Sequence, residues 1–329
     1  MSKTVTVGPA AVSGGQAHPL RLPPLGLGCA MLGRTDHGLD DAAAIDAIRH
    51  AAARGIAWFD TAPLYGAHLS EIRLGAALAT IVPPPLVSTK IGFDFISPPG
   101  RVVAATARRS DYSAAFAARS FAASCARLGR AHLDLVFVHD PAGAADVASA
   151  GAVAALEQLR ADGRVGAIGV GVNDVGVARD LLARVRLDAV LLAGRYTLLD
   201  WSGASFLREC HDAGIATIVA APLASGLLAT GARNPGTYLY QPAPAGIRAR
   251  VAAIEVICER HGVSLRAAAL RFAAANPHAT SLLIGAGTRA EIDDTLACLA
   301  THIPAALWDD LAAAGLLAAE LARPTEPPR

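Results

Sequence analysis

The chain has 329 residues, of which 53% are hydrophobic and 17% are charged. Because soluble domains average about 45–50% and about 25% for these two classes, this composition supports a large core and excludes an intrinsically disordered chain. Lys and Arg total 29 against 28 for Asp and Glu, and the resulting net charge of +1 argues against a nucleic-acid-binding surface.

Nothing in the sequence points to a membrane or to secretion. Charged residues or histidine interrupt every apolar span before it reaches about 18 residues, and the N-terminal stretch lacks the apolar block of a signal peptide. The five cysteines are scattered and form no CxxC pair, a pattern typical of reduced, packed thiols. We therefore expect a cytoplasmic protein that does not bind a membrane.

Short apolar runs alternate along the chain with helix-like stretches, several of which end at a glycine. Continuous runs of this kind are typical of parallel strands buried on both faces. The predicted strands are Leu25–Cys29, Ala57–Thr61, Leu86–Lys90, Leu133–His139, Ala167–Gly171, Asp188–Ala193, Ala216–Ala221 and Ser281–Ala286. Eight strand–helix alternations over about 260 residues predict a single-domain α/β chain with a (β/α)8 TIM barrel, and a doubly wound open sheet is the competing architecture.

Four segments fall outside the eight units. We expect an N-terminal hairpin or tail within residues 1–22, a C-terminal helix over 304–322 and a flexible tail over 324–329. The long connections 91–112 and 223–246 follow strands, so they are predicted to lie at the carboxyl end of the barrel, where barrel active sites are built.

Reactive side chains stand at the ends of three predicted inner strands. Asp60, Lys90 and His139 each close a strand, and Tyr65 lies one short loop beyond Asp60. A buried carboxylate needs a partner, which Lys90 can provide from the next strand. An ammonium beside a phenol favours the phenolate and lowers its pKa, so this set predicts proton transfer at a substrate oxygen by Tyr65, with a hydrogen bond from His139. Proton transfer of this kind suggests hydride chemistry with a diffusible cofactor.

Plainer interpretations of the same residues remain open at this point. Asp60 and Lys90 can be a structural ion pair, Tyr65 a packing residue and His139 a core histidine. The other histidines, including His211 and His278, are most simply surface or packing residues. No HExxH segment or Cys/His cluster has the spacing of metal ligands, so we expect no metal site.

The segment Phe59–Gly66 (FDTAPLYG) resembles the signature DTAxxYG of the aldo-keto reductase superfamily. The stretches Ser120–Pro141 and Leu156–Gly171 resemble further segments of that family, and the similarity covers about residues 22–300. The resemblance implies an eightfold barrel with NAD or NADP as cofactor. It places the family's catalytic tetrad on Asp60, Tyr65, Lys90 and His139.

The second half of the chain resembles a narrower group within the superfamily, the L-fucose and D-threo-aldose 1-dehydrogenases. The segments that carry this likeness are Gly194–Gly203, Ala220–Ala229 and Thr237–Val251. The likeness implies oxidation of a sugar's anomeric hydroxyl to a lactone. A pyridoxal 4-dehydrogenase or a general aldehyde or ketone reductase is the alternative enzyme, and a cofactor-binding regulatory subunit, as in potassium channels, is the alternative of another class.

Cofactor contacts are implied by the same resemblance. Asn173 corresponds to the asparagine that binds the nicotinamide carboxamide, residues 223–227 to the loop over the pyrophosphate and residues 285–288 to the adenosine-phosphate turn. The residues so assigned are Asn173, Leu223, Ser225, Gly226, Leu227, Gly285, Ala286, Gly287, Thr288 and Glu291. NAD is favoured over NADP, because Ala286 and Glu291 stand where NADP-preferring relatives tend to place a basic residue.

Aromatic residues on the loops over the expected site are candidates for substrate binding. Phe93, Trp201 and Tyr238 either stack on the apolar face of a sugar or cover the mouth of the barrel. The expected partner is a small molecule, an aldose or an aldehyde, and the expected assembly is a monomer or a small homo-oligomer.

Overall fold

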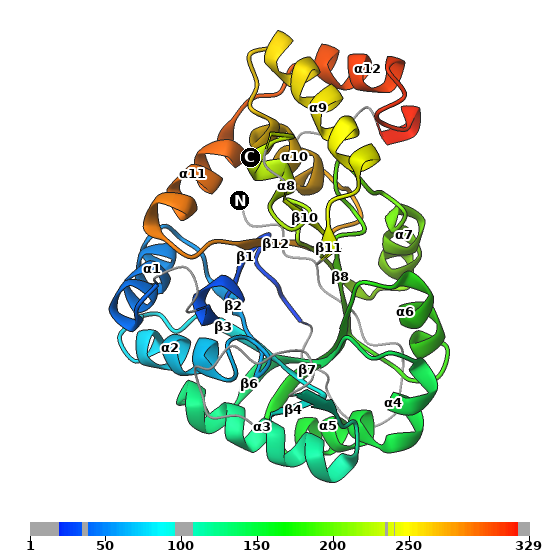
Figure 1. Cartoon of the computed structure of the whole chain (residues 1–329). Coiled ribbons are helices and arrows are strands. Elements are labelled where there is room, and N and C mark those ends of the chain that lie inside the picture. The colour runs from blue at the N-terminus through cyan, green and yellow to red at the C-terminus, as the bar shows by residue number, and fades with distance from the viewer. Residues whose placement is uncertain (1–19, 35–38, 96–107, 234–235, 240, 322–329) are drawn as a thin grey trace.

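A closed barrel of eight parallel strands forms the centre of the molecule (Figure 1). The computed structural model describes residues 20–34, 39–95, 108–233, 236–239 and 241–321. In their order around the barrel the strands are β1 (Leu25–Gly28), β2 (Trp58–Asp60), β3 (Leu86–Ile91), β6 (Leu133–His139), β7 (Val165–Val172), β8 (Ala189–Ala193), β9 (Ala216–Ala220) and β12 (Ser281–Gly285). The prediction of an eightfold barrel is confirmed, and the open sheet is excluded because β12 pairs with β1.

Helices surround the strands, as Figure 1 shows in a view into the barrel. They are α1 (Asp41–Ala53), α2 (Leu69–Leu78), α3 (Ala114–Leu128), α4 (Ala144–Ala150), α5 (Ala152–Ala161), α6 (Val175–Leu182), α7 (Ala204–Asp212), α8 (Leu227–Thr230), α9 (Ala245–Arg260), α10 (Leu265–Ala274), α11 (Arg289–Ala300) and α12 (Ala305–Ala313). Helices α9 and α12 pack against each other on one flank of the ring.

Local sequence signals set the helix ends. The side chain of Asp40 accepts a hydrogen bond of 2.7 Å from the backbone N–H of Ala43 and so caps α1. At the other end of a helix, Gly129 adopts the left-handed conformation that closes α3. These caps direct the chain from each helix into the next strand.

Large side chains and glycines share the barrel interior. Trp58, Phe137 and Ile218 are fully buried there. A Cβ atom on Gly26 of β1 would lie 2.2 Å from the indole of Trp58. Glycine at position 26 therefore makes room for the tryptophan in the centre of the barrel.

Two separate two-stranded antiparallel sheets lie where the sequence suggested only long connections. Strand β4 (Phe93–Phe95) pairs with β5 (Arg108–Ser110), and β10 (Thr237–Tyr238) pairs with β11 (Gln241–Pro242).

The predicted C-terminal helix is shorter than expected. Gly315, with a φ of +66°, follows α12, and the described part of the chain ends with a 3-10 turn (Ala319–Leu321). The predicted tail 324–329 lies outside the described residues, as does the N-terminal hairpin except for residues 20–22.

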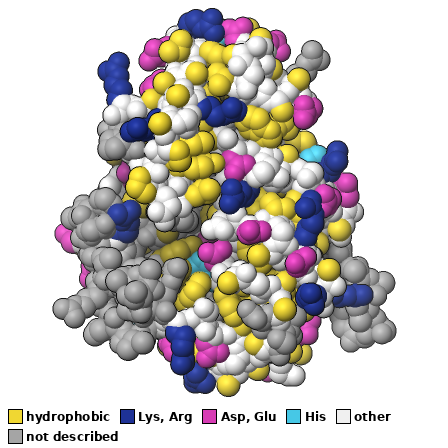
Figure 2. Space-filling model, turned by 45° about the vertical axis from the view of Figure 1, so that its right-hand side comes forward, with side chains coloured by type: hydrophobic (Ala, Val, Ile, Leu, Met, Phe, Trp, Pro, Cys, Tyr) yellow, Lys and Arg dark blue, Asp and Glu magenta, His cyan; other side chains and the backbone are white. Residues whose placement is uncertain are grey.

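On the face shown in Figure 2, acidic and basic side chains are interspersed among hydrophobic ones. This mixing agrees with the near-balance of charge in the sequence. Among the described residues, no helix combines the length and the apolar character needed to cross a bilayer.

Candidate active site

Three neighbouring strands bring the predicted reactive residues to the same end of the barrel. Asp60 is the last residue of β2 and pairs in register with Ser88 of β3, while Lys90 pairs with Phe137 of β6. His139 is the last residue of β6. Because the strands are parallel and adjacent, their carboxyl ends meet, and the side chains that follow them share one mouth.

Lys90 and Asp60 form a buried ion pair. Both side chains are almost inaccessible to solvent, at 2% and 1% exposure, and the Lys90 ammonium donates a hydrogen bond to Asp60 Oδ2. A second bond of 2.9 Å runs from Lys90 Nζ to the carbonyl oxygen of Thr61. Ser88 donates a bond of 2.7 Å to the other Asp60 oxygen. The charges are therefore paired and hydrogen-bonded, as burial requires.

The Lys90 ammonium also lies against Tyr65. Its Nζ atom stands 4.7 Å from the centre of the phenol ring. Burial disfavours the charged amine, but the Asp60 carboxylate and the electrostatic and hydrogen-bonding contact with Tyr65 outweigh this and raise the pKa of Lys90 above its ordinary value. Lys90 is thus a fixed positive charge beside the phenol, the arrangement that the sequence predicted.

His139 completes the group. Its imidazole packs edge-on against Tyr65, with ring centres 5.8 Å apart, and against Phe93, with ring centres 5.3 Å apart. The Tyr112 hydroxyl donates a hydrogen bond of 3.0 Å to the backbone carbonyl of His139. The backbone contact and the two rings hold the imidazole in place at the mouth of the barrel.

Two supporting residues were not identified from the sequence. Ser88 stands two positions before Lys90 on the same strand, so strand alternation places both on the inner face and the signal was present. Tyr112 lies 27 residues from His139 in the chain. No local pattern marks it, and only the fold shows its contact.

The turn that presents Tyr65 depends on a close backbone contact. Gly66 has a φ of +62°, and a Cβ atom there would lie 1.9 Å from the carbonyl oxygen of Gly33. The hydroxyls of Thr61 and Ser70 lie 2.8 Å apart, and Ser70 donates a bond of 2.8 Å to the carbonyl of Cys29. The residues of the DTAxxYG segment therefore form a tight, interlocked turn.

The variant Gly66→Ala is expected to lose about 2 kcal/mol or more of stability and to lower kcat, because relief of the clash displaces Tyr65. Urea denaturation and steady-state kinetics measure both effects. Gly55→Ala is the matched control: Gly55 has a φ of +90° but open space around its Cβ position. Equal losses in the two variants would show that backbone conformation alone matters and that the contact with Gly33 does not.

Known proteins similar to this chain belong to the family that its sequence motif suggested. The model of the Aldo/keto reductase family matches residues 24–315. A D-threo-aldose 1-dehydrogenase from Pseudomonas sp is 35% identical over 325 residues, which cover 94% of this chain and 98% of that protein.

The chain belongs to the aldo/keto reductase family. It is accordingly an NAD(P)-dependent oxidoreductase. A pyridoxal 4-dehydrogenase from Microbacterium luteolum is 32% identical, over 91% of this chain and 95% of that protein.

Solved structures of other aldo-keto reductases share the fold. An aldo-keto reductase from Bacillus halodurans in its holo form superposes with a TM-score of 0.72 at 22% identity, covering 88% of this chain and 90% of the other. The glycerol dehydrogenase of Gluconobacter oxydans gives a TM-score of 0.70 at 19% identity, with 99% of both chains covered.

The carboxyl ends of β7, β9 and β12 fit the nicotinamide cofactor that the family uses. The side-chain amide of Asn173 makes no hydrogen bond within the described part of the chain, while its backbone carbonyl accepts a bond of 2.6 Å from Arg195. After β9, Ala224, Ser225 and Gly226 all have positive φ, so the loop before α8 is tightly curved. Backbone N–H groups in such curved segments suit phosphates.

The turn after β12 is also open. Gly285 is exposed and a Cβ atom there would meet nothing within 4 Å. Thr288 caps α11 by accepting a bond of 3.2 Å from the N–H of Glu291, and the Glu291 carboxylate accepts a bond of 2.7 Å from Gly287. Arg289 faces Asp46 of α1 at 3.4 Å. The Glu291 carboxylate is thus held at this turn, and the neighbouring Arg289 guanidinium is paired with Asp46.

The three aromatic substrate candidates occupy different positions. Phe93 contacts His139 directly. Tyr238 belongs to a polar chain, because it interacts electrostatically with Asp200, and Asp200 lies 3.0 Å from Arg195, which in turn binds the carbonyl of Asn173. This chain connects the loop of Tyr238 to the end of β7.

Trp201 lies beneath the guanidinium of Arg250, whose centre stands 4.9 Å from the indole. It also lines a cavity of about 490 Å³ between α7 and the loop that precedes β12. No tetrad residue lines this cavity. A role for Trp201 in binding substrate stays a prediction.

Proposed function

We propose that this aldo-keto reductase oxidises the anomeric hydroxyl of an aldose to the lactone, with Tyr65 as the proton-transfer residue and NAD as the preferred cofactor. The observation that carries the proposal is the position of the Lys90 ammonium, held by Asp60 and the Thr61 carbonyl against the phenol of Tyr65. The likeness to a D-threo-aldose 1-dehydrogenase over almost the whole chain supports the choice of a sugar.

The residues at the mouth of the barrel have separate roles in the proposed reaction. The positive charge of Lys90 stabilises the phenolate of Tyr65, which then takes the proton of the substrate hydroxyl. The Asp60 carboxylate keeps Lys90 in place and charged. The imidazole of His139, fixed through its backbone by Tyr112, hydrogen-bonds the substrate oxygen and orients it toward Tyr65. A bound nicotinamide supplies the two-electron acceptor for the hydride from C1.

The same tetrad supports a second candidate, oxidation of pyridoxal, and one contact favours it. Phe93 packs against His139 and offers an aromatic wall beside the site, which suits a pyridine ring. The 32% identity with a pyridoxal 4-dehydrogenase points the same way. A sugar instead needs polar groups around several hydroxyls, and we propose the chain formed by Tyr238, Asp200 and Arg195 as their source.

The deciding experiment supplies NAD with a panel of aldoses that includes L-fucose and D-threo sugars, and with pyridoxal, and follows the absorbance of the reduced cofactor. We expect the highest kcat/KM with an aldose. A higher value with pyridoxal would favour the second candidate. Cofactor binding without turnover on any substrate would favour a regulatory subunit.

NAD is expected to give a higher kcat/KM than NADP, because the charge of Glu291 at the turn after β12 repels a 2′-phosphate. Glu291→Gln keeps an acceptor for the N–H of Gly287 but removes the charge. This variant should raise the NADP to NAD ratio of kcat/KM roughly threefold or more, the effect of one partly exposed charge. Parallel kinetics with both cofactors measure it, and a wild-type enzyme that prefers NADP tenfold would contradict the proposal.

A further inference from the structure

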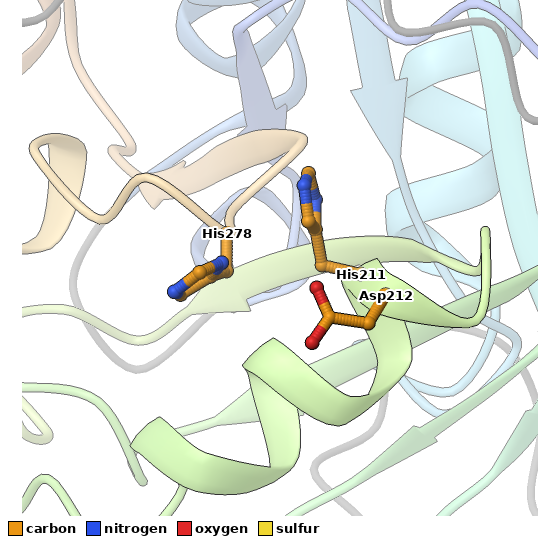
Figure 3. Close-up of side chains that lie close together, drawn as sticks. All are labelled: His211, Asp212 and His278. Carbon is orange, nitrogen blue, oxygen red and sulfur yellow. The ribbon is translucent and has the colours of Figure 1, made fainter.

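A second group of chemically active side chains lies at the opposite end of the barrel from Tyr65. His211 and Asp212 end helix α7, just before β9 begins, and His278 lies in the turn just before β12 (Figure 3). Because β9 and β12 are neighbouring parallel strands, their amino ends meet at this face. The tetrad occupies the carboxyl ends of β2, β3 and β6, so the mechanism uses none of these three residues.

One ligand atom of each of the three side chains lies close to those of the other two. Each offers one ligand atom, a ring nitrogen or a carboxylate oxygen, and these atoms all lie within 4.8 Å of one another. The centres of the two imidazole rings are 5.3 Å apart. With zinc–nitrogen bonds of about 2.1 Å and a tetrahedral angle, the ring centres of two ligating imidazoles lie about 5 Å apart. The ring centres therefore have the spacing of two ligating imidazoles, and the ligand atoms, which lie within 4.8 Å of one another, must rotate toward a common ion.

The backbone around His278 is held rigidly. Its N–H donates a bond of 2.8 Å to Asn276 Oδ1, and its carbonyl accepts a hydrogen bond from the hydroxyl of Thr217. Asn276 and Thr217 are both buried. On the other side, the last turn of α7 holds His211, whose carbonyl accepts a bond of 3.0 Å from Gly214. Because the backbone is held on both sides, rotation of the side chains has to bring the ligands onto an ion.

Among the residues that the structure describes, the charged groups next to the two imidazoles are one carboxylate and one guanidinium. Asp212 contributes a negative charge and is exposed to solvent. Arg208, on the preceding turn of α7, is the opposing positive charge at this face.

We propose that His211, Asp212 and His278 bind one divalent transition-metal ion of the zinc class. Two imidazole nitrogens and one carboxylate oxygen suit zinc, nickel or copper(II), whereas magnesium and calcium prefer oxygen ligands alone. Three protein ligands leave a fourth position for water. The ion would join the end of α7 to the loop before β12, so its expected effect is on stability and not on turnover.

The test is a zinc titration of the full-length protein, stripped with a chelator and freed of any purification tag. Competition with a chromophoric chelator should give one equivalent bound with a Kd at or below about 10 μM. His211→Ala and His278→Ala should each weaken binding at least tenfold, and Asp212→Asn severalfold. Magnesium at the same concentration should not compete.

His261→Ala is the matched control. His261 Nε2 lies 2.9 Å from Asp310 Oδ2, but within the described part of the chain it belongs to no three-ligand group. We expect unchanged zinc binding in this variant. Saturating zinc should raise the Tm of the wild-type protein by a few degrees and leave the Tm of His278→Ala unchanged.

The proposal is overturned if no stoichiometric binding is seen up to about 100 μM zinc, or if the three ligand variants bind as tightly as the wild type. The second result would place the ion elsewhere. Neither result bears on Tyr65 or on the proposed oxidation.

Discussion

Tyr65→Phe is expected to lower kcat by about 10²–10⁴-fold, the range of a single well-placed proton-transfer group. The substitution removes only the hydroxyl, so the ring keeps its packing against His139 and its place beside Lys90. The cofactor contacts proposed at β7, β9 and β12 are remote from this atom, and the Kd for the cofactor should stay nearly the same. Steady-state kinetics and a fluorescence titration with the reduced cofactor measure the two quantities.

The control for this variant is Tyr112→Phe. Tyr112 supplies a hydroxyl to the backbone of His139 and touches no reacting atom in the proposed mechanism. Its loss should cost much less in kcat than the loss of the Tyr65 hydroxyl. Unchanged turnover in Tyr65→Phe would remove Tyr65 from the mechanism, and equal losses in both variants would mean that general disturbance of the mouth is responsible.

Lys90→Met is expected to lower both stability and activity. The Asp60 carboxylate is 1% exposed and would lose its charged partner, which typically costs about 3–5 kcal/mol. The phenolate of Tyr65 would also lose the charge that stabilises it, so kcat should fall about 10²-fold or more. Urea denaturation and steady-state kinetics on the aldose of the highest activity measure the two losses.

The double variant Asp60→Asn with Lys90→Met separates the two roles of Lys90. It contains no buried charge at this position, so most of the stability should return while the activity stays low. If the activity returned together with the stability, the ion pair would have only a structural role. That is the plainer interpretation of Asp60 and Lys90 that the sequence left open. If stability did not return, the fixed geometry around Ser88 and Thr61 would be the dominant contribution.

Local patterns in the sequence predicted the barrel strands and the ends of several helices. Continuous apolar runs such as Leu135–Val138 must be buried on both faces, and caps such as Asp40 and Gly129 act within one turn of their own helix. The DTAxxYG segment also placed Asp60 and Tyr65 at one turn. These signals depend on neighbours in the chain, so they are visible without the fold.

The sequence did not predict several contacts between segments that lie far apart in the chain. The pairing of β4 with β5 crosses a long connection, and the bond from Tyr112 to His139 depends on how that connection returns to the barrel. The predicted helix over 304–322 is interrupted because Gly315 adopts a positive φ.

The sequence by itself indicated which segments form the buried strands and, to within one residue, where each strand has its carboxyl end, so it also indicated which side chains are available at that end of the barrel. Tertiary structure alone decided which of those side chains meet, because a closed sheet brings together strands that no periodicity relates. It brought the Tyr112 hydroxyl to the backbone carbonyl of His139, and it brought His278 to His211 and Asp212 at the opposite end. Hydrogen bonds and coordination act over a few ångströms in space, whatever the separation along the chain.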